Sequence, residues 1–372
     1  MKKTLALLLA LVMVLSLTAC GAKSEPAPAA APAEAAPAEA APAEAAPAEA
    51  APAEAAAEVD FGDAVTLTLA HIRPEGSSAD IAIKAFCEEV TTATNGTVTF
   101  EIYPASQLGD YTQVFEQVMV GDVDMQFATI PTSVDKFFGI GNAAYVATTW
   151  AEAKEVFATG GAVQDAITKR ASEVGITNLC MYPFYFGGIA LGVDPVDPTN
   201  PDAQNGIKIR VPSMTSFEKT AENLGYLGTP LPSSETFTSM QTGVVDGAIG
   251  MGAEGYYSNL GDLTKYFLPI NDHFECWNLI INSEKFASLS AAQQDAIKTA
   301  ATNLEAKRWE VAEAETDTYI EKLKTDYNVT VIEFTDEELA AFAAKVRENV
   351  WPLIREDFGG ELFDQVTAAV LK

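Results

Sequence analysis

Histidine is almost absent from this 372-residue sequence, which contains only His71 and His273. A histidine-based triad or a multi-histidine metal site therefore has little material to draw on. The GxSxG, Walker, GxGxxG and HExxH motifs of hydrolases, nucleotide-binding proteins and zinc peptidases are also missing. We predict that the protein is not an enzyme and uses no cofactor or metal. The rival interpretation, an extracellular hydrolase, would need an activated nucleophile beside a base.

Cysteine is scarce as well. Apart from Cys20, the sequence has Cys87, Cys180 and Cys276, and no CxxC spacing indicates a metal site. Three cysteines cannot all pair with one another in disulfides. We therefore expect them to be small, buried, free side chains.

Basic residues are few, since 23 Lys and Arg stand against 52 Asp and Glu, for a formal net charge of −29. We therefore expect no nucleic-acid partner, and a small anionic ligand would have to be held by local positive groups. Arg210 is the best candidate, because it lies between Ile209 and Val211 in what reads as a short buried strand. A buried guanidinium needs a partner, either an internal Asp or Glu or the carboxylate of a ligand.

Membrane-spanning runs are missing too. The apolar run 5–17 follows Lys2 and Lys3 and reads as a secretory signal rather than a spanning helix. Small residues precede Cys20, so we predict a lipoprotein signal peptide over 1–20 and a lipidated Cys20; an ordinary signal peptide is the alternative. The protein would then be extracytoplasmic, lipid-anchored to the outer face of the cell membrane or periplasmic.

Residues 21–58 are rich in Ala, Pro and Glu, and the sequence APAEA occurs five times in tandem from Ala31 to Ala55. Such a segment cannot form a core, because proline at every fifth position interrupts helix and few large apolar side chains are present. We predict an extended tether.

The remainder reads as a two-lobed α/β fold with mostly parallel sheets. Strands and helices alternate in both halves, and the apolar passage 176–191 is predicted to cross between the lobes. The predicted elements include strands at 65–72, 97–104, 124–130, 207–211 and 245–251, and helices at 78–94, 150–175, 215–225, 233–243, 253–266 and 335–354.

One unusually long helix, from 291 to 319 or beyond, is predicted to brace both lobes. Ile297, Leu304 and Val311 follow heptad spacing, but the pattern stops there, which argues against a coiled coil. The predicted lobes combine distant segments of the chain: lobe I takes 59–186 plus 276–314, and lobe II takes 187–275 plus 315–372.

The segment 205–250, NGIKIRVPSMTSFEKTAENLGYLGTPLPSSETFTSMQTGVVDGAIG, contains a G-x-K-x-R-V-P strand and a later Q-x-G-V-V-D-G turn. It resembles the central signature of solute-binding proteins of tripartite ATP-independent periplasmic (TRAP) transporters, the DctP type. Flanking pieces agree with that resemblance: LTLAHIRPEGS from Leu67, YPASQLGD from Tyr103 and KYFLPINDH from Lys265.

The resemblance implies a two-lobed fold of the periplasmic-binding-protein type, in a receptor whose lobes close around a small organic acid and perform no chemistry. Arg210 matches the arginine that clamps the ligand carboxylate in that family. The implied partners are the small and large TRAP membrane subunits, and we expect a monomer. A receptor of an ABC importer or a ligand-sensing module remains as an alternative.

Two departures from the family bear on the ligand. A second arginine often found after the crossover would fall on Ile189 or Ala190, and an asparagine that follows the VVDG turn is replaced by Gly250. With one cation fewer and an aromatic crossover containing Tyr185 and Phe186, the expected ligand is a monocarboxylate with an apolar or aromatic body rather than a sugar acid. These aromatics could equally belong to the core.

Further candidates lie where strands end or the chain turns, since ligands gather at the carboxyl ends of strands. Each has an ordinary alternative: a surface position for Arg73, and core packing for the others. The additional predicted ligand-binding residues are His71, Arg73, Tyr111, Thr129 and Trp277.

Overall fold

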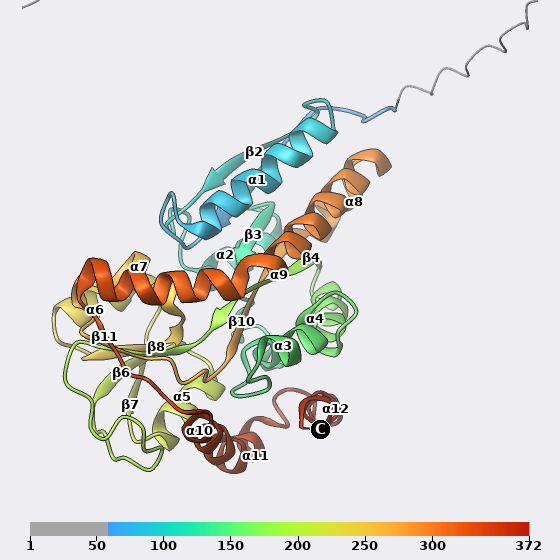
Figure 1. Ribbon diagram of the computed structural model, residues 1–372. Coiled ribbons are helices and arrows are strands. Elements are labelled where there is room, and N and C mark those ends of the chain that lie inside the picture. The colour runs from blue at the N-terminus through green and yellow to red at the C-terminus, as the bar shows by residue number, and fades with distance from the viewer. Residues whose placement is uncertain (1–58, 372) are drawn as a thin grey trace, which may run out of the picture. The chain divides into compact units, whose positions relative to one another are not determined.

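The computed structural model describes residues 59–371, which form one five-stranded and one six-stranded sheet with helices around them (Figure 1). The predicted signal peptide, the tether and Cys20 lie outside the described residues. None of the helices within residues 59–371 combines the length and the apolar character needed to cross a membrane.

The first sheet has the strand order β2-β1-β3-β10-β4. Strand β1 pairs in parallel with β2 and β3, whereas β10 pairs antiparallel with β3 and β4. Its strands are β1 (Val65–His71), β2 (Val98–Tyr103), β3 (Met125–Ala128), β4 (Ile176–Phe186) and β10 (Phe274–Asn282). The connecting helices include α1 (Ser78–Ala93) and α2 (Tyr111–Val120).

The second sheet has the order β11-β9-β5-β8-β6-β7. Its strands are β5 (Gly188–Leu191), β6 (Lys208–Val211), β7 (Leu227–Pro230), β8 (Gly247–Met251), β9 (Tyr266–Leu268) and β11 (Thr330–Val331). The helices that connect them are α5 (Thr215–Asn223), α6 (Thr236–Gln241) and α7 (Ala253–Leu260). Five of the nine strand pairs in the two sheets are parallel and four are antiparallel. The predicted α/β fold is confirmed, but its sheets are mixed, because the strands that cross between them run against their neighbours.

The chain passes from the first sheet to the second at Gly187, between β4 and β5, and it returns between β9 and β10. The two crossings touch, since the Gly187 amide donates to the His273 carbonyl at 2.9 Å. A Cβ atom at position 187 would lie only 2.1 Å from Cε1 of His273, so no larger residue fits there without movement. The two segments that cross between the sheets are therefore tightly packed against each other at this point.

Helix α9 (Ala291–Tyr327) confirms the long brace. It packs on α1 and β4 beside the first sheet and on α7 and β11 beside the second, and Figure 1 shows it running across the molecule. Ile297 and Leu304 are buried, but Val311 is half exposed, so the apolar heptad does not continue as a coiled-coil seam.

Several predicted helices are shorter than expected. The single helix predicted over 150–175 is wrong: α3 (Trp150–Phe157) and α4 (Ala162–Glu173) are separated at Gly160, whose φ of +86° no helix allows. A 3-10 turn (Ser233–Glu235) precedes α6. The break predicted at Pro352 falls two residues earlier, at Val350, between α10 (Asp336–Asn349) and α11 (Trp351–Ile354), since the proline sits in the first turn of the next helix.

Other elements of residues 59–371 were not predicted. They include the strands β7, β9, β10 and β11, the 3-10 helix η1 (Lys136–Asn142), the 3-10 turn η3 (Gly261–Leu263), α8 (Ser283–Ser288) and α12 (Gly360–Val370). Cys87, Cys180 and Cys276 are buried and free, as predicted.

The start of α9 gives a stability prediction. The Ser290 hydroxyl accepts from the Gln293 amide at 3.2 Å, and the Gln293 side chain accepts from the Ser290 amide at 3.0 Å. Ser290→Ala should therefore lower the free energy of unfolding by about 1 kcal/mol in urea denaturation. Thr318→Ala, an exposed change within the same helix, is the control and should stay within about 0.5 kcal/mol of the parent. Equal stability of the two variants would contradict this cap assignment.

Candidate functional site

A cavity of about 40 Å³ lies where side chains from both sheets meet. The first sheet and its connections contribute Ile72, Arg73, Tyr111, Thr129, Asn142, Tyr185, Glu275 and Trp277. The second contributes Arg210, Pro212, Met214, Phe217, Ser233, Gly250 and Met251. Six of the eight predicted ligand-binding residues therefore line one cavity: Arg73, Tyr111, Thr129, Tyr185, Arg210 and Trp277.

Arg210 enters the cavity from β6, where Ile209 and Val211 point to the opposite face. Its side chain is buried, with 2% exposed, and it donates from Nε to the Leu231 carbonyl at 3.0 Å and from Nη1 to the Ile249 carbonyl at 3.5 Å. Within residues 59–371, no Asp or Glu oxygen lies within 4.0 Å of its guanidinium. Burial lowers the pKa of Arg210 below its ordinary value, but an arginine stays charged in proteins. The cavity therefore contains a cation without a counter-charge of its own.

Arg73, just beyond the end of β1, is also buried but has partners. Its Nε lies 3.2 Å from a carboxylate oxygen of Glu254, and Nη2 donates to the Tyr185 hydroxyl at 3.3 Å. Its guanidinium carbon also lies 5.2 Å from the ring centroid of Trp277. Burial works against the charge, but Glu254 and Tyr185 outweigh it and raise the pKa of Arg73. Arg73 is thus neutralised by an internal acid, which makes it a poor substitute for the missing second cation.

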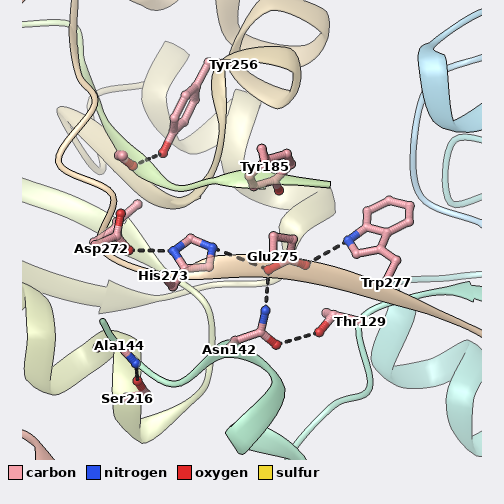
Figure 2. A network of polar contacts seen from close by, with 12 residues as sticks. Thr129, Asn142, Ala144, Tyr185, Ser216, Tyr256, Asp272, His273, Glu275 and Trp277 are labelled. Carbon is pink, nitrogen blue, oxygen red and sulfur yellow. Dashed lines mark hydrogen bonds and ion pairs between the residues drawn. The ribbon is translucent and has the colours of Figure 1, made fainter. Parts of the chain in front are cut away.

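Glu275 also lines the cavity, and it is the one charged residue of β10. Its Oε1 accepts from the Trp277 indole at 2.8 Å, and its Oε2 accepts from the Asn142 amide, whose own oxygen accepts from Thr129 at 2.8 Å. His273 Nε2 lies 3.4 Å from Oε2, an ion-pair distance. Figure 2 shows the carboxylate at the centre of these groups. The network fixes the orientation of Glu275.

His273 sits between two acids, because its Nδ1 is bonded to Asp272 at 2.6 Å and its Nε2 faces Glu275 (Figure 2). Burial alone would lower the pKa of the imidazole. The two carboxylates outweigh it and raise the pKa of His273 to about 9. The imidazole is therefore a buried cation at neutral pH.

Two predicted site residues lie elsewhere. His71 does not line the cavity; its Nε2 contacts Asp80 at 3.3 Å, and burial lowers its pKa despite that acid. Phe186 packs against Trp150 and Phe274 with ring centroids 5.5 and 4.9 Å apart, so it belongs to the core.

The departures from the family pattern also have definite positions. Ile189 and Ala190 are fully buried in β5 and do not line the cavity. Gly250 does line it, and a Cβ atom there would lie 2.5 Å from Pro212 and 3.6 Å from Nη1 of Arg210. With a φ of +93°, this position favours glycine. No side chain from position 250 therefore reaches the guanidinium.

Sequence reasoning missed Glu275, Asn142 and the His273 cluster. A charged residue within the apolar run 274–281 was a usable signal, by the same argument that singled out Arg210. Asn142 had no such signal, because it lies in a 3-10 helix that the sequence pattern did not predict. Among residues 59–371, no three His, Cys, Asp or Glu side chains are placed to hold a metal ion.

The raised pKa of His273 predicts how stability depends on pH. An unfolded histidine titrates near 6.5, so the stabilisation from charged His273 is complete below that pH and is lost as the pH rises towards 9. Unfolding in urea should show a loss of up to about 3 kcal/mol across this window. His273→Gln should flatten that slope. The assignment would be contradicted if the free energy of unfolding of the parent depended on pH as weakly as that of the variant.

Comparison with known proteins agrees with this geometry. Residues 69–356 match the DctP family, bacterial extracellular solute-binding protein family 7. A solute-binding protein of Roseobacter denitrificans is 29% identical over 315 residues, covering 82% of this chain and 94% of that protein. Its crystal structure, described as a TRAP periplasmic solute binding protein with bound L-galactonate, aligns with a TM-score of 0.69 at 23% identity, covering 80% of this chain and 99% of that one.

The crystal structure of a sugar acid binding protein from Advenella mimigardefordensis, in complex with galactonate, aligns with a TM-score of 0.76 at 20% identity and covers 83% of this chain and 98% of that one. At this identity the likeness concerns the fold. The family consists of solute-binding receptors rather than enzymes. Because the family match extends over most of the chain, the protein belongs to the DctP family of bacterial extracellular solute-binding proteins.

Proposed function

We propose that this protein is the extracytoplasmic receptor of a TRAP transporter, that Arg210 clamps the carboxylate of a small organic acid, and that the closed form delivers it to the small and large membrane subunits. In this proposal the receptor works as a monomer. Lipid on Cys20 tethers it to the membrane, and residues 21–58 span the distance between the lipid and the receptor domain.

One observation carries the proposal: a buried guanidinium that faces a cavity and has backbone carbonyls as its only close protein partners among residues 59–371. Leaving a cation in that state costs several kcal/mol. A ligand carboxylate can accept two parallel hydrogen bonds from the guanidinium fork and offset that cost. The arrangement is better suited to binding than to stability.

The remaining lining favours a compact ligand with an apolar or aromatic body. Ile72, Met214, Phe217, Met251 and Trp277 present apolar surface to the cavity. The Roseobacter relative binds L-galactonate, which also has one carboxylate but carries hydroxyl groups along its chain. We infer the same carboxylate clamp here with a less hydroxylated ligand.

Binding requires the two sheets to move apart, because about 40 Å³ holds only a few water molecules. A larger recess of about 470 Å³ opens beside the cavity and shares Tyr111 with it; residues 109–113, 231, 232, 234 and 235 are among those that line it. Across this entrance the Ser234 amide donates to Asp110 at 3.2 Å, and the Thr132 hydroxyl donates to the Ser213 carbonyl at 3.4 Å. Exposed bonds of this kind are weak, which suits reversible opening.

Replacement of Arg210 tests the clamp. In thermal-shift and calorimetric screens of a carboxylic acid library, Arg210→Ala should lower the affinity for every ligand of the parent by roughly 30-fold or more. The reason is that a lost buried charge pair costs about 2–5 kcal/mol. Arg210→Lys should recover only part of this affinity, because an ammonium lacks the planar fork. Without ligand, Arg210→Ala should unfold at or above the melting temperature of the parent, since it removes a buried charge that has no close acidic partner.

Arg170→Ala is the matched control, because this exposed arginine pairs with Asp135 and Glu173 away from the cavity. It should bind as the parent does. An Arg210→Ala protein that retained full affinity for a ligand of the parent would refute the clamp.

A further inference from the structure

We propose that the ligand is a zwitterion, with its carboxylate on Arg210 and a hydrogen-bonding ammonium at the Glu275 end of the cavity. The inference rests on the proposed role of Arg210 and goes further, because it assigns Glu275 as a second binding residue. It replaces a simple monocarboxylate anion with an amino acid or a closely similar compound.

The first argument is the charge of the buried groups in and beside the cavity. Three are cations and three are acids, and all six are at most 5% exposed: Arg73, Arg210, His273, Glu254, Asp272 and Glu275. Arg73 is paired with Glu254, and His273 is shared between Asp272 and Glu275. The set therefore carries no net charge when every member is ionised.

A net-neutral site favours a net-neutral ligand. A monocarboxylate bound to Arg210 would add one negative charge to this neutral set. The buried groups would then contain one acid more than cations, and Glu275 would have no cation to itself. An uncompensated charge in a water-excluded site costs several kcal/mol. A zwitterion supplies both missing partners at once, an anion for Arg210 and a cation for Glu275.

The second argument is the geometry around Glu275. Trp277, Asn142 and His273 approach its two oxygens, and the Thr129 hydroxyl orients Asn142 (Figure 2). An ionised carboxylate can accept about four hydrogen bonds, and only three groups approach the Glu275 oxygens here. The remaining capacity is available to a donor on the ligand. A second ligand carboxylate, in contrast, would be repelled, so dicarboxylates are excluded.

The two ends of the cavity are close enough for a small molecule. Arg210, Glu275 and Tyr111 all line this one cavity of about 40 Å³. Burial has the largest effect on the pKa of Tyr111 and raises it, whereas Arg210 lowers it and Glu275 raises it. An amino acid holds its carboxylate and ammonium on one carbon, so its two charged groups can approach both partners together. Trp277, Phe217 and Met214 then surround its side chain.

The test compares ligands that differ only at the ammonium. Purified receptor is screened by calorimetry with the standard amino acids, the matching 2-hydroxy acids, the matching acids without either group, and succinate. The parent should bind at least one amino acid at least tenfold more tightly than its hydroxy and unsubstituted counterparts, and it should not bind succinate.

Glu275→Gln should reverse this preference: the amino acid should lose roughly 30-fold in affinity, whereas the matching anions should gain. Glu305→Gln is the matched control, because Glu305 is equally buried, bonds Thr159 and lies outside the cavity. It should leave the ligand preference unchanged. A cooperative melting transition shows that the Glu275→Gln protein is folded.

Two outcomes overturn the inference: no amino acid binds the parent, or Glu275→Gln and the parent discriminate equally between amino acid and anion. The proposed function fails in a different way. If the parent binds a plain anion more tightly than any amino acid, and Arg210→Ala loses that binding, the clamp stands and only the zwitterion is wrong. If Arg210→Ala binds as well as the parent, the clamp itself is wrong.

Discussion

The burial of the Arg210 guanidinium without a carboxylate partner is the constraint on which the site depends. Its contacts with the Leu231 and Ile249 carbonyls orient the side chain but do not neutralise it. The fold accepts this cost within a protein that has more than twice as many acids as bases. In a chain of net charge −29, an isolated cation in a closed cavity creates the local field that a soluble anion needs for capture.

The contrast with Arg73 shows how the same residue type takes two roles within one cavity. Glu254 and Tyr185 saturate Arg73, and Trp277 packs against it, so it stabilises the closed arrangement of strands and helices. At Arg210, Gly250 leaves the space beside the guanidinium without a side chain. Glu275, held by its own network, adds a buried acid to the same lining. The site thus combines an arginine without a close acid, a fixed acid, and apolar and aromatic walls.

Local patterns predicted much of the fold. Alternation in 65–72 indicated a strand, the apolar run 176–191 indicated the crossing between the lobes, and Ser290 indicated the start of the long helix, because these signals depend on neighbours in sequence. The helix predicted over 150–175 failed at Gly160, whose left-handed backbone conformation outweighs the periodic pattern around it. For the site, strand ends and isolated charges indicated six lining residues, but Phe186 and His71 pack elsewhere.

The sequence by itself determined the class of the protein: an acidic, histidine-poor α/β receptor with one arginine in an apolar strand and a signature of the DctP family. Tertiary structure alone decided which charges neutralise one another. Arg73 meets Glu254 from 181 positions away, and Asn142 reaches Glu275 across 133. Whether a buried charge is paired depends on such distant contacts and on the water they exclude, and no local pattern encodes them.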